Sequence, residues 1–131
     1  MRLFTAIVHK DDGSAYGLTF PDLPGAHAAA DTWDEIPRAA VEALDLWFED
    51  ADDLVPSSID SLRARPDVGA ALAEGATLMT VPYIPADGAP ERINVSIERG
   101  LLRAVDAAAR ARGMTRSAFL AAAARREIVG V

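Results

Sequence analysis

The sequence predicts an α+β fold with a smaller module appended at its C-terminal end. Three observations lead to this prediction. Short stretches with alternating apolar residues surround one amphipathic helix in residues 1–84, a proline- and glycine-rich stretch, "PADGAP", occupies residues 85–90, and residues 91–131 change from a strand pattern to a helix pattern. A chain of 131 residues has room for one small domain and such a module.

The first two predicted strands form a hairpin in "LFTAIVHKDDGSAYGLTF", residues 3–20. Asp12 and Gly13 mark its turn, because a tight hairpin turn needs positive φ, which glycine adopts freely and aspartate tolerates. The second strand then places its larger apolar side chains on one face, at Tyr16, Leu18 and Phe20.

A proline-rich turn, "PDLPG" at residues 21–25, ends the second strand and leads to a third extended stretch, "AHAAAD". A helix follows, and we place its N-cap at Asp34 or expect a distorted first turn. The reason is Pro37, which must fall among the first helical residues, where no N–H is needed. The apolar stripe of this helix consists of Ile36, Ala40, Leu44, Trp47 and Phe48.

The rest of the first region predicts two short helical turns and a fourth strand. The turns lie within residues 56–75 and are separated at Pro66, and the strand is "TLMTVPYI". Pro82 confines this strand to a sheet edge or brings it to an end. The order strand, strand, strand, helix, strand predicts one helix packed on a sheet in residues 1–84, with 85–90 as a linker to a second domain, 91–131.

The second domain begins with a predicted strand, "ERINVSI" at residues 91–97, in which apolar and polar side chains alternate. A first helix is expected over residues 98–112, ended by Gly113 in the left-handed conformation. Asp106 and Arg110 are expected to form an outward i, i+4 ion pair on it.

A second helix of this domain is expected to begin directly after the first. Thr115 is a good N-cap, and Met114 and Phe119 then occupy the two positions of a hydrophobic staple. Arg125 and Arg126 fall in the last turn, where positive charge suits the helix dipole. All local signals in this domain therefore agree with strand, helix, helix.

A domain this small buries too little surface to fold alone, and an isolated strand has no hydrogen-bonding partner. We therefore expect a two-fold dimer, in which the strand pairs antiparallel with its own copy. Such a ribbon fits the major groove of DNA, where Arg pairs with guanine and Asn with adenine, and a helix N-terminus binds phosphate. The predicted base contacts are Arg92, Asn94 and Ser96, and the predicted phosphate contacts are Thr115, Arg116 and Ser117.

Charge is distributed unevenly along the chain. Residues 1–90 carry five basic and sixteen acidic side chains, a net −11, whereas residues 91–131 carry eight arginines and four acids, a net +4. An acidic body with a basic module is typical of a chain that meets two different partners, and a pair of solvated faces is the alternative.

Composition argues against several classes of protein. The chain has no cysteine, which excludes disulfides, thiol catalysis and thiolate metal sites. It contains neither a membrane-length apolar run nor a signal peptide, so we expect a soluble, cytoplasmic protein without a membrane partner.

Candidate catalytic and metal-binding residues in the first region are few. His9 and His27 lack a second ligand at metal-site spacing, and the loop aspartates have local structural explanations, so we expect no cofactor, no metal and no enzymatic activity. A magnesium-dependent nuclease that uses Asp11 or Asp22 remains as an alternative hypothesis.

The stretch "RINVSIERGLLRAVDAAARARGMTRSAFLAAAARREI" resembles the ribbon-helix-helix DNA-binding domain. The resemblance implies major-groove readout by the outward strand residues and backbone anchoring at the start of the second helix.

The body, with "YGLTFPDLPG", "ADTWDE" and "AAVEAL", resembles HicB-type antitoxins. That resemblance implies a degenerate ribonuclease H-like domain without activity, which blocks a small, basic, RNA-cleaving HicA-type toxin. It also implies that the protein represses the operon that encodes the pair. "AHAAAD" and Pro37 depart from the usual pattern of that family, and no toxin-contacting residue is assigned. The alternative is a stand-alone ribbon-helix-helix regulator with a ligand- or partner-sensing N-terminal domain.

Overall fold

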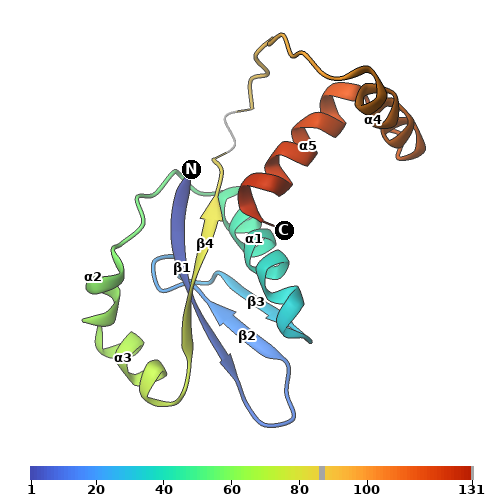
Figure 1. The fold of residues 1–131 in the computed structure, drawn as a ribbon. Coiled ribbons are helices and arrows are strands. Elements are labelled where there is room, and N and C mark those ends of the chain that lie inside the picture. The colour runs from blue at the N-terminus through green and yellow to red at the C-terminus, as the bar shows by residue number, and fades with distance from the viewer. Residues whose placement is uncertain (86–87, 131) are drawn as a thin grey trace. The chain divides into compact units, whose positions relative to one another are not determined.

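The computed structural model describes residues 1–85 and 88–130. The chain forms two compact units, Met1–Pro85 and Ala86–Val131, which are described separately (Figure 1). Residues 86–87 of the predicted linker lie outside the described residues.

The first unit is built on one four-stranded sheet. Its strands are β1 (Arg2–Lys10), β2 (Tyr16–Thr19), β3 (His27–Ala30) and β4 (Thr77–Tyr83), in the order β3-β2-β1-β4, and all neighbours are antiparallel. The predicted succession of three strands, a helix and a fourth strand is confirmed, as is the α+β class. β4 lies at an edge of the sheet, as Pro82 predicts, because proline cannot donate to a further strand.

The two predicted turns are present. Gly13 has a φ of 75°, and the Ser14 N–H donates to the Asp11 carbonyl at 3.1 Å, within the five-residue loop that joins β1 to β2. In the "PDLPG" turn, the Asp22 carboxylate accepts hydrogen bonds from the N–H and the hydroxyl of Ser57, at 2.8 and 2.7 Å. Asp22 therefore fastens this turn to the segment that precedes α2 (Ile59–Arg63).

The main helix starts later than Asp34. A 3-10 turn, η1 (Trp33–Glu35), comes first, and α1 (Ile36–Phe48) begins with Glu35 as its N-cap. The predicted N-cap at Asp34 is therefore wrong, and the predicted alternative, a distorted first turn, is correct. Pro37 causes this arrangement, because it occupies one of the first two helical positions, where a missing N–H costs no hydrogen bond.

The core lies mainly between α1 and the sheet. The buried residues on α1 are Ile36, Ala40, Ala43 and Leu44, and the Trp47 and Phe48 of the predicted stripe are half-buried. β1 is buried on both faces, since residues 4–8 are all buried in succession. Its second face is covered by α2 and α3 (Pro66–Ala73), which lie on the side of the sheet opposite α1 (Figure 1). Each of these two helices buries one large apolar side chain, Leu62 on α2 and Val68 on α3.

The second unit contains two helices joined by a tight turn. α4 (Arg99–Ala111) ends at Gly113, whose φ is 65°, and α5 (Arg116–Val129) follows. The N–H of Met114 donates to the Ala109 carbonyl at 2.8 Å, and the N–H of Gly113 donates to the Arg110 carbonyl at 3.1 Å. These two bonds form a Schellman motif, so the predicted glycine end of the first helix is confirmed.

The predicted strand at residues 91–97 is not formed in the single chain. Residues 88–98 carry neither helix nor strand. The physical reason is that a β-strand is defined by hydrogen bonds to a neighbouring strand, and none of the described strands of this chain pairs with the segment.

Candidate nucleic-acid interface

The start of α5 is arranged as the sequence predicts. Thr115 is the N-cap, and its hydroxyl accepts a hydrogen bond from the Ala118 N–H at 3.1 Å. The first N–H groups of any α-helix have no carbonyl partner within the helix. Thr115, Arg116 and Ser117 are all exposed, and the N–H groups of Arg116 and Ser117 donate no described hydrogen bond, so they are the donors that an anion could use.

Arg116 has an intramolecular partner. Its Nε and Nη2 donate to the two carboxylate oxygens of Asp106 on α4, each at 2.9 Å. The predicted ion pair of Asp106 with Arg110 is therefore replaced by a pair with Arg116. The hydrogen bonds from Arg116 are the main cause that lowers the pKa of the Asp106 carboxyl, and the same bonds raise the pKa of Arg116.

The predicted base-contacting residues lie in the segment without regular structure that precedes α4. Arg92, Asn94 and Ser96 are all exposed. Their apolar neighbours are exposed as well: Ile93 has 74% and Val95 59% of its surface accessible. Among the described residues, no hydrogen bond or ion pair joins this group to the start of α5.

The second unit has a small core when considered as one chain. Its buried residues are Val105 and Ala109, both on α4, and α5 buries no residue fully. Leu101 on α4 and Ile128 on α5 remain 57% and 54% exposed. Isolated apolar residues at a surface are ordinary, but here four large apolar side chains of one small unit are exposed, namely Ile93, Val95, Leu101 and Ile128.

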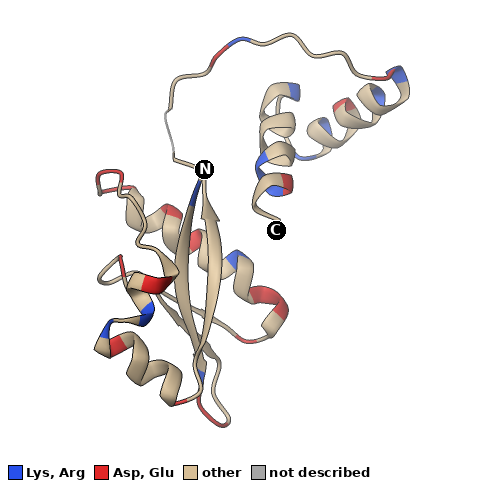
Figure 2. Cartoon of the chain, turned by 60° about the vertical axis from the view of Figure 1, so that its left-hand side comes forward, with Lys and Arg blue, Asp and Glu red and all other residues tan. Residues whose placement is uncertain are grey.

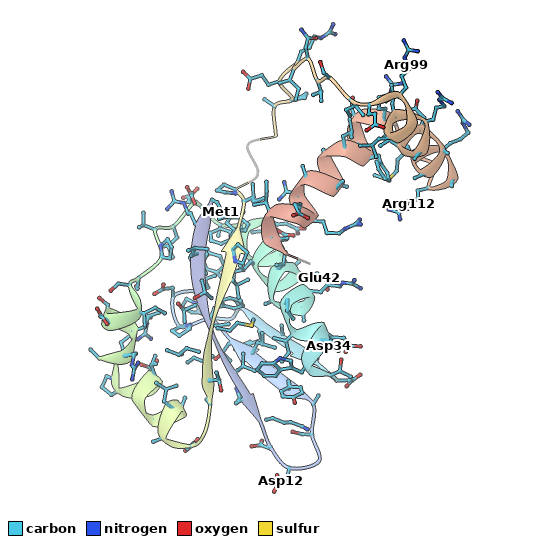
Figure 3. The ribbon with its side chains drawn as sticks, viewed as in Figure 1. Met1, Asp12, Asp34, Glu42, Arg99 and Arg112 are labelled. Atoms are coloured by element: carbon cyan, nitrogen blue, oxygen red, sulfur yellow. The ribbon has the colours of Figure 1, made fainter. Side chains whose placement is uncertain are left out.

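Positive charge is concentrated on this unit. Figure 2 shows Arg along both of its helices, whereas Asp and Glu dominate the helices and loops of the first unit. Figure 3 labels Arg99 and Arg112 near the two ends of α4. Arg112 also lies over the ring of Phe119 on α5, 5.6 Å from the ring centre, a contact between the helices that the sequence pattern did not reveal.

The acidic side chains in the described part of the first unit are dispersed over its helices and loops. Asp22 binds Ser57, and Asp12 lies at the tip of the β1–β2 hairpin, while Asp34 and Glu42 point away from the sheet (Figure 3). Within residues 1–85 and 88–130, no group of three or more His, Cys, Asp or Glu side chains is placed to hold a metal ion.

Comparison with known proteins identifies the family. Residues 4–124 match the family described as HicB_like antitoxin of bacterial toxin-antitoxin system. The Burkholderia pseudomallei antitoxin HicB is similar in structure, with a TM-score of 0.55 and 38% identity over 95% of this chain and 96% of that one. A UPF0150 protein of Archaeoglobus fulgidus is 35% identical over 46 residues, which are 35% of this chain and 67% of that protein.

A further solved structure is similar to this chain in fold. A chain of the HicA3 and HicB3 toxin-antitoxin complex has a TM-score of 0.52 at 21% identity, over 63% of this chain and 99% of that one. The chain described here belongs to the HicB-like antitoxin family of bacterial toxin-antitoxin systems, whose members are not enzymes. In the described part of the chain, no helix has the length and apolar character to cross a bilayer.

Proposed function

We propose that this antitoxin binds and neutralises a HicA-type toxin through residues 1–84 and represses its own operon through residues 91–131. The observation that carries the proposal is the opposite charge of the two regions, −11 in residues 1–90 and +4 in residues 91–131. An acidic surface favours a basic, RNA-binding toxin, whereas a basic one favours DNA phosphates. Because both proposed partners are intracellular, the antitoxin is proposed to act in the cytoplasm.

The second unit, residues 91–131, is proposed to be a ribbon-helix-helix domain that dimerises through the strand predicted at residues 91–97. Ile93 and Val95 are exposed in the single chain and alternate with polar residues, which is the pattern of a strand with one face to be buried. Antiparallel pairing with a second copy gives the strand its hydrogen bonds and covers the apolar side chains of both copies.

In that dimer the polar face of the ribbon is proposed to enter the major groove. Arg92, Asn94 and Ser96 then lie where they can read base edges, while the N–H groups at the start of α5 hold a phosphate. The first unit is proposed to be a degenerate ribonuclease H-like domain, a proposal supported by its small antiparallel sheet with α1 on one face.

The toxin-binding function is tested with a small basic protein of the HicA type, taken from the reading frame beside the antitoxin gene where that frame encodes one. We expect that protein to arrest growth and cleave RNA when produced alone, and the antitoxin to abolish both effects in a stable complex. An unrelated protein of similar net charge is the control, because it separates specific binding from charge alone. RNA cleavage that persists at saturating antitoxin would contradict the proposal.

The base-reading role of Asn94 is tested by Asn94→Ala. We expect binding to the operator to weaken by about 1–3 kcal/mol per lost base contact, because Ala cannot pair with a base edge. Binding to an unrelated duplex of the same length should stay unchanged. Fluorescence anisotropy with both duplexes measures this, and an equal loss on both would show that Asn94 does not read sequence.

A further inference from the structure

Asp106 and Arg116 form the one ion pair described between α4 and α5 in residues 88–130. Arg116 is the first residue of α5, and Asp106 lies in the middle of α4. The guanidinium is held through Nε and Nη2 at once, at 2.9 Å each, in a two-point contact that fixes its plane.

This pair matters for the arrangement of the two helices because few apolar side chains are fully buried between them. The single chain buries only Val105 and Ala109 on α4 and no residue fully on α5, so polar contacts contribute to the angle between the helices. The pair joins α4 to the first turn of α5, which is the turn proposed to hold phosphate.

The same pair removes a free positive charge from that turn. A guanidinium bound to a carboxylate carries no net charge with its partner, so its attraction to a distant phosphate is largely cancelled. A phosphate would have to compete with Asp106 for the same donors, and it would bring its own negative charge close to that carboxylate.

We propose that Arg116 is a positioning residue, which holds the first turn of α5 against α4 through Asp106 and is not itself a phosphate ligand. This inference rests on the proposed DNA binding and revises the part that Arg116 plays in it. Phosphate contact at this place then falls to Thr115, Ser117 and the backbone N–H groups, and the charge of Asp106 is tolerated only because Arg116 cancels it.

The test compares the full-length wild type with Arg116→Gln and with the double variant Asp106→Asn, Arg116→Gln. Binding is measured with a duplex from upstream of the antitoxin gene and with an unrelated duplex, over a range of salt concentrations. We expect Arg116→Gln to weaken binding to both duplexes, because it leaves Asp106 uncompensated. The double variant keeps two side chains that can hydrogen-bond to each other, so we expect it to recover binding to within about threefold of wild type. The slope of log affinity against log salt concentration should stay unchanged, because that slope counts the phosphates that the protein neutralises.

Arg103→Gln on α4 is the matched control, since it removes the same charge and, among the described residues, Arg103 forms no hydrogen bond or ion pair with Asp106. Adding Asp106→Asn should improve binding much more in the Arg116→Gln background than in the Arg103→Gln background. The inference is overturned if the double variant stays as weak as Arg116→Gln and its salt slope falls by about 0.9 for each lost phosphate contact. Failure of the wild type to bind either duplex would reject the proposed DNA binding and this inference together.

Discussion

Replacing Phe4 by alanine is expected to lower the free energy of unfolding of the first unit by about 3–5 kcal/mol, through lost burial and the cavity left behind. The Phe4 side chain is fully buried. Its ring centre lies 5.4 Å from that of Phe48 and 6.2 Å from that of Tyr83, and the latter two rings stack at 4.4 Å. The cluster joins β1, α1 and β4, so none of its members can fill the space without moving another element.

This prediction is measured by urea unfolding with tryptophan fluorescence. Both tryptophans of the chain, Trp33 and Trp47, lie in the first unit, so the signal reports that unit alone. Leu3→Ala is the matched control, because Leu3 directly precedes Phe4 in the same strand but is 51% exposed, and a change within about 0.5 kcal/mol is expected there. Equal losses for the two variants would show that the aromatic cluster does not hold the fold together.

Local patterns in the sequence were sufficient for most elements of the fold. Asp12 and Gly13 marked the first hairpin, Pro82 placed the last strand at an edge, and Gly113 and Thr115 marked the junction between the two helices. Each of these signals is a property of one residue and its immediate backbone, such as positive φ or a missing N–H. Such properties act before any tertiary contact is made, which is why sequence alone reveals them.

Features that depend on distant residues were not predicted. Asp106 pairs with Arg116, ten residues away, because the turn at Gly113 brings the start of α5 back toward α4, whereas helical spacing alone favoured Arg110. The hydrogen bonds between Asp22 and Ser57 likewise depend on the path of the chain between them. Charge and periodicity show which side chains could pair with one another, but the path of the folded backbone determines which of them come close enough to do so.

The segment before α4 shows the same limit at the level of the assembly. Its alternation predicts a strand, yet a strand requires a partner that one chain does not contain. Ile97 is half-buried, whereas Ile93 and Val95 are exposed. The proposed second copy would therefore complete both the hydrogen bonding of the backbone and the burial of these side chains, so folding and dimerisation of this unit are expected to be linked.

Removal of residues 91–131 is expected to abolish operator binding and to leave toxin neutralisation largely intact. The deleted region contains all the proposed DNA contacts and eight of the thirteen basic side chains. The remaining chain carries a net −11 and should be repelled by DNA, so non-specific binding should disappear too. Fluorescence anisotropy with operator DNA and a growth assay with the toxin measure the two activities.

The full-length variant Val95→Asp tests the same division of labour without shortening the chain. An aspartate on the face proposed to be buried between two strands should prevent dimerisation, because an unpaired buried charge is strongly unfavourable. Operator binding should be lost and toxin neutralisation retained, as in the truncated protein. If either variant loses toxin neutralisation while tryptophan fluorescence shows a folded first unit, the two units do not act independently. The second unit would then have to contribute to toxin binding directly or by pairing two first units.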